Sequence, residues 1–110
     1  MNKFTLIFFS IVTLSLTSAN AAIYKGQMVF VKKCLPCHKD GETLLAKYKM
    51  DHWEELMNEN GKQLADLHLK SKKAEKSWAY FRGKRYLKKS KDLKDFLVEY
   101  AKDSGNVPVF

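Results

Sequence analysis

The chain has few of the residues that commonly form turns or cross-links in loop-rich and β-sheet folds. Among its 110 residues there are two prolines, five glycines and two cysteines. Two cysteines can form one disulfide at most, so cross-links alone cannot build this domain. Few segments offer the turn signals that separate short strands, whereas apolar residues recur at helical spacing. The composition therefore predicts an all-α fold.

The first 21 residues differ from the rest of the chain. A single positive charge at Lys3 precedes the uncharged, mostly apolar run from Phe4 to Leu16, and Ala19-Asn20-Ala21 fits a small-x-small cleavage site. We expect a secretory signal over residues 1–21 and a mature domain over residues 22–110. A cut after Ala22 fits as well. Retention as a membrane anchor is the alternative, although the apolar run is shorter than the ~20 residues of a spanning helix.

Acidic residues are outnumbered. There are 20 lysines and arginines against 12 aspartates and glutamates, a formal net charge of +8. Much of the positive charge lies in three blocks, Lys32-Lys33, Lys70 to Lys76 and Arg82 to Lys91. Such runs ordinarily form a solvated surface. They also suit a docking face for acidic partner proteins or anionic lipid headgroups. No motif supports nucleic-acid binding.

Helical spacing recurs in several segments of the mature chain. We expect helices over residues 23–33, 42–48 and 51–61, a short piece around Trp78 and Phe81, and a last helix. Pro36 is expected to end the first helix, and Asp51 to cap the third. The last should be capped by Ser90 or Asp92 and carry a stripe of Leu93, Phe96, Leu97 and Tyr100.

Cys34-Leu35-Pro36-Cys37-His38 has the C-x-x-C-H spacing of c-type haem attachment. Two thiols three residues apart on one turn can each form a thioether with a vinyl group of one porphyrin. The next residue, His38, can then bind the iron. Three other readings remain: a thioredoxin-like redox pair, which normally belongs to a βαβ pattern, half of a zinc site without its second half, and a structural disulfide.

The segment Gly26-x-x-x-Phe30-x-x-x-Cys34-x-x-Cys37-His38 resembles the start of the class I cytochrome c family. The stripe Leu93-x-x-Phe96-Leu97-x-x-Tyr100 resembles that family's last helix. The resemblance covers both ends of the mature chain and leaves out its middle. It implies a small helical fold around one covalently attached haem c. In it, Gly26 and Phe30 would meet Phe96, Leu97 and Tyr100 where the first and last helices cross.

The sixth iron ligand departs from the family pattern. Class I members usually supply a methionine shortly before the last helix, but Ser77 to Lys91 contains neither methionine nor histidine. His68 is the preferred candidate, because it shares an apolar helix face with Leu64 and Leu67 and lies far enough along the chain to reach the other haem face. Met50 is the main alternative.

Met28, His52 and Met57 are weaker candidates for the sixth ligand, and water or an open site also remains. Several polar-tipped side chains either bind the haem propionates or simply pack. They are Trp53, Trp78, Arg82, Arg85 and Tyr86.

The resemblance implies a periplasmic electron carrier. Electrons would pass through an exposed haem edge to redox partners with acidic docking surfaces, in solution or in the membrane. No small-molecule substrate and no enzymatic activity are expected. Two alternatives remain: a haem c subunit of a larger oxidase or dehydrogenase, and a ligand-binding or sensor protein with an open iron site.

Overall fold

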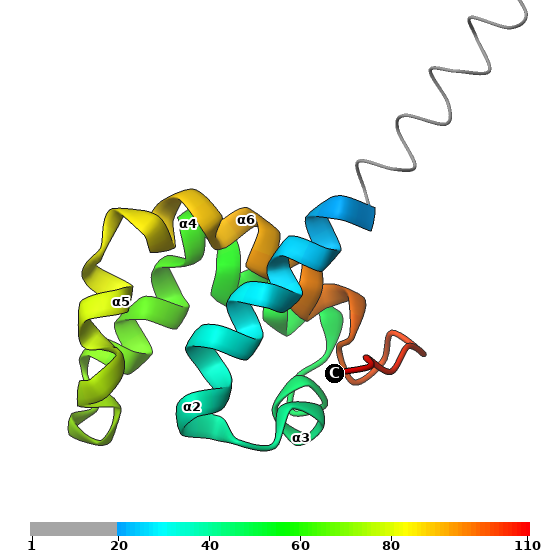
Figure 1. Cartoon of the computed structure of the whole chain (residues 1–110), viewed down its shortest axis with the longest axis horizontal. Coiled ribbons are helices and arrows are strands. Elements are labelled where there is room, and N and C mark those ends of the chain that lie inside the picture. Colours follow the sequence, from blue (N-terminus) through cyan, green and yellow to red (C-terminus); the bar gives the residue numbers. More distant parts are fainter. Residues whose placement is uncertain (1–19) are drawn as a thin grey trace, which may run out of the picture.

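The computed structural model describes residues 20–110, which are folded into helices joined by short connections, with no strand in this range (Figure 1). The expected all-α class is confirmed. The expected signal segment, residues 1–21, lies almost entirely outside the described residues. None of the helices in the described range combines the length and the apolar character needed to cross a membrane.

The helix that begins the described chain is longer than expected. Residues 20–29 are helical and continue through a π-helical turn, η1 (Phe30–Cys34), into α2 (Leu35–His38). The expectation that Pro36 ends this helix was wrong. Pro36 lies in the first turn of α2, where a missing N–H is tolerated, and the wider π turn directly precedes it. The helix ends at Lys39, whose positive φ of 59° reverses the chain.

The next helix is short, and the one after it is divided. α3 (Gly41–Leu45) begins at Asp40, whose carboxylate accepts hydrogen bonds from the Thr43 backbone N–H at 3.1 Å and the Thr43 hydroxyl at 2.8 Å. α4 (Met50–Leu69) begins after Lys49 rather than at the expected cap Asp51, which falls inside its first turn.

α4 is interrupted where the sequence predicted an end. Asn58 is extended, and Glu59, Asn60 and Gly61 have positive φ values of 52°, 58° and 75°. The chain then resumes a helix in a new direction. The turn is fixed from outside, because the Tyr86 hydroxyl donates a 2.6 Å hydrogen bond to the Gly61 carbonyl oxygen. A side chain on Gly61 would collide with that hydroxyl. Tyr86 therefore determines where the second half of α4 lies.

The last third of the chain holds η2 (Lys72–Ser77), α5 (Trp78–Arg82) and α6 (Lys84–Glu99). The expected cap of the last helix at Ser90 or Asp92 was wrong, since α6 begins after Gly83. The reason is that its buried stripe starts earlier: Tyr86 is 1% exposed and Ser90 is also buried. Both continue the line of Leu93 and Phe96 toward the start of the helix.

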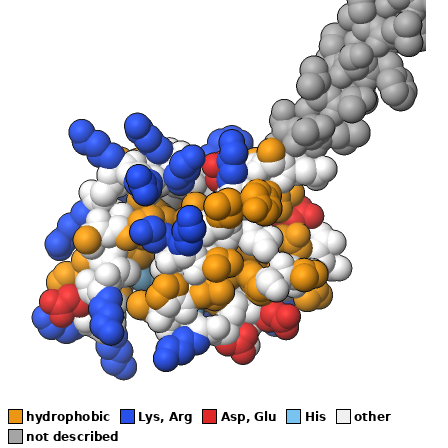
Figure 2. All heavy atoms as spheres, viewed as in Figure 1, with side chains coloured by type: hydrophobic (Ala, Val, Ile, Leu, Met, Phe, Trp, Pro, Cys, Tyr) orange, Lys and Arg blue, Asp and Glu red, His pale blue; other side chains and the backbone are white. Residues whose placement is uncertain are grey.

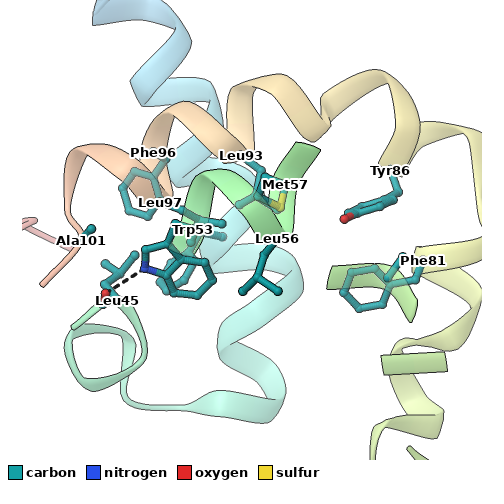
Figure 3. Packing of buried hydrophobic residues seen from close by; sticks show 12 residues of the cluster. Leu45, Trp53, Leu56, Met57, Phe81, Tyr86, Leu93, Phe96, Leu97 and Ala101 are labelled. Atoms are coloured by element: carbon teal, nitrogen blue, oxygen red, sulfur yellow. Dashed lines mark hydrogen bonds between the residues drawn. The ribbon is translucent and has the colours of Figure 1, made fainter. Parts of the chain in front are cut away.

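The core forms where α4 and α6 pack along each other. Trp53, Leu56 and Met57 of α4 lie against Leu93 and Leu97 of α6 (Figure 3). The Trp53 indole N–H donates to the Leu45 carbonyl oxygen at 3.1 Å, which ties α3 to this core.

The first helix crosses α6 on the other side (Figure 1). The ring centroids of Phe30 and Phe96 are 5.1 Å apart. A Cβ on Gly26 would strike the Asp92 carbonyl oxygen and lie 2.7 Å from the Phe96 Cβ, so only glycine permits this approach. The expected meeting of Gly26 and Phe30 with Phe96 is therefore present. Phe110 adds a third ring, stacked 5.8 Å from Phe30.

Replacement of Gly61 tests the turn within α4. Gly61→Ala should lower the free energy of unfolding by about 2–4 kcal/mol, because a positive φ and the collision with the Tyr86 hydroxyl act together. Gly105→Ala is the matched control: φ there is also positive, at 79°, but nothing lies within 4 Å. It should cost about 1 kcal/mol. Equal losses in denaturant titrations of the two variants would show that the Tyr86 contact is unimportant.

Candidate functional site

A cavity of about 410 Å³ opens between the first helix, α4 and the segment from η2 to α5. Its volume falls in the range of ~300–1,000 Å³ that is usual for cofactor pockets. Most of its wall is apolar, including Phe30, Leu56, Leu64, Phe81, Leu93 and Leu97. The polar groups that reach it are few, and four of them are the sulfur and imidazole side chains singled out from the sequence.

Cys34, Cys37 and His38 all line this cavity. Cys34 closes the π turn, and Cys37 and His38 form the end of α2, so one helical stretch presents both thiols and the imidazole to the same space. Both cysteines are free. Burial of the Cys34 thiol, followed by the nearby Cys37, raises its pKa to about 12. Because a redox nucleophile needs a low thiol pKa, this environment does not suit a thioredoxin-like pair.

The zinc alternative also finds little support. Within residues 20–110, no three or more histidine, cysteine, aspartate or glutamate side chains are grouped to hold a metal ion. A structural zinc site ordinarily takes four such ligands.

His68 faces His38 across the cavity. The two ring centroids are 6.2 Å apart and the rings are nearly perpendicular, at 75°. His38 comes from the end of α2, whereas His68 comes from the last turn of α4, beyond the break at Gly61. The two side chains therefore approach from independent elements, with Cys34 and Cys37 on the His38 side.

The hydrogen bond of His68 selects its tautomer. Its Nδ1 lies 2.8 Å from the Leu64 carbonyl oxygen. A carbonyl oxygen can only accept, so this bond places a proton on Nδ1, and in the neutral ring Nε2 then carries the free lone pair. Metal-bound histidines commonly donate their other ring N–H in this way, which fixes the orientation of the ring.

The separation of the two rings matches a pair of imidazoles on one metal ion. Metal–nitrogen bonds of ~2.0–2.1 Å, with each ring centroid roughly 1 Å beyond its nitrogen, place the centroids about 6 Å apart. The observed 6.2 Å is within that geometry. The donor set thus fits a metal held between the two rings, inside an apolar wall that suits a flat macrocycle.

The other candidate ligands lie elsewhere. Met50 is 36% exposed at the start of α4, where its backbone N–H donates to Asp103, and it does not line the cavity. His52 is exposed and stacks on Tyr48 at 4.1 Å. Met57 is 2% exposed within the core, and Met28 is 41% exposed on the first helix. Among the five side chains considered, only His68 shares the cavity with His38.

The mouth of the cavity is positively charged. Lys33 of η1, Lys47 of the connection between α3 and α4, and Lys73 of η2 line it, and no aspartate or glutamate does. Partial burial of the His38 ring lowers its pKa, and the nearby His68 and Lys47 lower it further. In Figure 2, histidine atoms are visible in a recess with lysine and arginine side chains around it. The site therefore favours a neutral His38 imidazole and an anionic group at the rim.

The polar tips of Trp78 and Tyr86 are engaged with the backbone. The Trp78 indole N–H donates to the His68 carbonyl oxygen at 2.8 Å, and Tyr86 donates to Gly61. The Phe81 ring stacks on His68 with centroids 4.3 Å apart. The sequence offers one signal for this arrangement, since Trp78 and Phe81 are three residues apart and so share a helix face.

The comparisons return no relative of this chain: no protein-family model, no curated protein and no solved structure matches it.

Proposed function

We propose that this chain is an exported, single-haem c-type cytochrome that carries electrons in the periplasm. The observation that carries the proposal is the convergence of Cys34, Cys37, His38 and His68 on one apolar cavity, with the two imidazoles spaced for a single metal ion. When bound, the haem supplies an iron that takes up and releases one electron. The protein supplies attachment, axial ligands, an apolar wall and a docking surface.

Each residue of the site has one role in this proposal. Cys34 and Cys37 would hold the macrocycle by thioether bonds, and His38 would be the ligand on the attachment side. His68 would be the ligand on the opposite side, and Met50 remains outside. A second histidine in place of methionine lowers the reduction potential, because thioether ligation favours the reduced iron. The proposed carrier therefore works at a lower potential than the usual His–Met members of the family.

The three rim lysines support a role in recognition. Lys33, Lys47 and Lys73 surround the mouth of the cavity, so positive charge is concentrated where a haem edge would meet a partner. Complementary charge increases encounter rates and orients partners more than it increases affinity. The rim thus suits redox partner proteins with acidic docking surfaces, whether they are in solution or bound to the membrane.

The attachment motif is tested by expression beside a haem-ligation system. The purified mature chain should be coloured, and its mass should exceed that of its amino acids by one haem. Cys34→Ser and Cys37→Ser together should release the haem under denaturing acid–acetone extraction, because no thioether remains. A colourless wild-type protein with the bare polypeptide mass would refute the proposed function.

The axial ligand is tested by absorption spectra of the oxidised and reduced protein. His68→Ala should convert a low-spin spectrum to a high-spin one, because it removes the imidazole opposite His38. Met50→Ala and His52→Ala are the controls and should leave the spectrum unchanged, since neither side chain lines the cavity. A low-spin spectrum in His68→Ala, or loss of a Met–iron band in Met50→Ala, would contradict the assignment.

The rim is tested by charge reversal. Lys33, Lys47 and Lys73 changed to Glu should slow electron transfer to an acidic redox protein by about tenfold or more at low salt, and the difference should shrink as salt increases. The triple change of Lys84, Lys88 and Lys89 to Glu alters net charge equally, at exposed positions of α6 that do not line the cavity. If both triple variants slow transfer equally, net charge is sufficient and the rim has no special role.

A further inference from the structure

The last turn of α4, which carries His68, is held by a tryptophan from outside the helix. The Trp78 indole N–H lies 2.8 Å from the His68 carbonyl oxygen and 3.2 Å from the Ser71 carbonyl oxygen. One N–H group therefore joins the end of α4 to the start of the following segment. The Ser71 backbone N–H also donates to the His68 carbonyl oxygen, at 3.1 Å.

This contact adds to the backbone bonds at the end of the helix, where the Lys70 and Ser71 N–H groups also donate to the His68 carbonyl oxygen. The final carbonyl groups of an α-helix have no partner within the helix, so an unsupported last turn frays. His68 is in that last turn, with only Leu69 after it. Its ring hydrogen bond to Leu64 and its stack on Phe81 orient the imidazole, and the indole contact ties the backbone that carries it to the segment that follows α4.

The indole is itself fixed in place. The Lys72 ammonium and the Arg82 guanidinium lie 5.8 Å and 5.4 Å from the centre of the Trp78 ring, within range of cation–π attraction. Ser71, Lys73, Ala74 and Ser77, in the segment between His68 and Trp78, line the same cavity as His68. The indole thus closes a loop, residues 68–78, over one side of the site.

We infer that Trp78 is a positioning residue: its indole N–H keeps His68 at the iron and thereby keeps the iron closed to small molecules. This inference rests on the proposed function. An axial imidazole that leaves the metal opens a site for a diatomic ligand, and the rate of ligand entry follows the fraction of time spent open. Trp78 determines that fraction, although it does not touch the metal.

Trp78→Phe tests the inference, because it removes the N–H group and retains an aromatic ring. In the reduced holoprotein, carbon monoxide should bind about tenfold faster, the change expected for ~1.4 kcal/mol, within the range of one hydrogen bond. A high-spin component should appear in the oxidised spectrum, and added imidazole should abolish it by filling the vacated position. A merely structural role would not produce a component that imidazole removes.

Gln27→Ala is the matched control. It also removes a side-chain N–H that donates to a backbone carbonyl oxygen, that of Val109, at 2.9 Å, but Gln27 does not line the cavity. Its carbon monoxide rate and spectrum should equal those of the wild type. Equal effects of the two variants, or no effect of Trp78→Phe, would overturn the inference. A wild-type protein without haem would instead refute the proposed function.

If Trp78→Phe does not fold, a double variant tests the same inference. Lys72→Gln and Arg82→Gln together remove both cations beside the indole at exposed positions and leave the ring in place. Carbon monoxide binding should then be about two- to fivefold faster, as expected for weak exposed cation–π contacts. An unchanged rate would overturn the inference.

Discussion

The contact between the Tyr86 hydroxyl and the Gly61 backbone governs the geometry of the site. Cys34, Cys37 and His38 need no such contact to come together, because they are neighbours on one helical stretch. The position of His68 depends on the direction that α4 takes after its break. Three residues in left-handed conformation redirect the helix, and a buried hydrogen bond of 2.6 Å holds the turn against α6. His68 lies beyond that turn, and its ring centroid is 6.2 Å from that of His38.

The site combines a mostly apolar wall with two imidazoles and a basic rim. Such an arrangement suits a ligand with a flat apolar body and anionic edges, as haem has. It suits the competing chemistries less well: the Cys34 thiol is made less acidic by burial, and the described ligating side chains do not group as a zinc site requires. The separation of the two histidine rings leaves room for one metal ion between them, an observation independent of the cysteine motif.

Part of the fold and of the candidate site could be predicted from the sequence, because the sequence signals for that part are local. C-x-x-C-H places three groups on one turn whatever surrounds them. The resemblance to the class I family implied a helix crossing at Gly26 and Phe30, and the structure contains that crossing. The helix starts were harder to predict. Asp51 and Ser90 have capping side chains, but α4 and α6 begin earlier, because burial of residues such as Tyr86 outweighs a cap worth about 1 kcal/mol. The hydrogen bond from Trp78 to the His68 carbonyl oxygen arises from tertiary packing, so no periodic pattern in the sequence predicts it.

The π turn from Phe30 to Cys34 has a consequence for the orientation of the whole motif. Each residue of a regular α-helix advances about 100° around its axis, and a π turn holds one residue more than an α turn. Gly26, before the π turn, faces α6, and Phe30, its first residue, contacts Phe96 and also lines the cavity. Cys37 and His38, after the turn, line the cavity. The surplus residue thus sets the angular offset between the packing face and the ligating face. Deletion of one residue from the π turn would rotate both thiols and the imidazole away from the cavity together, although the C-x-x-C-H sequence itself would remain intact.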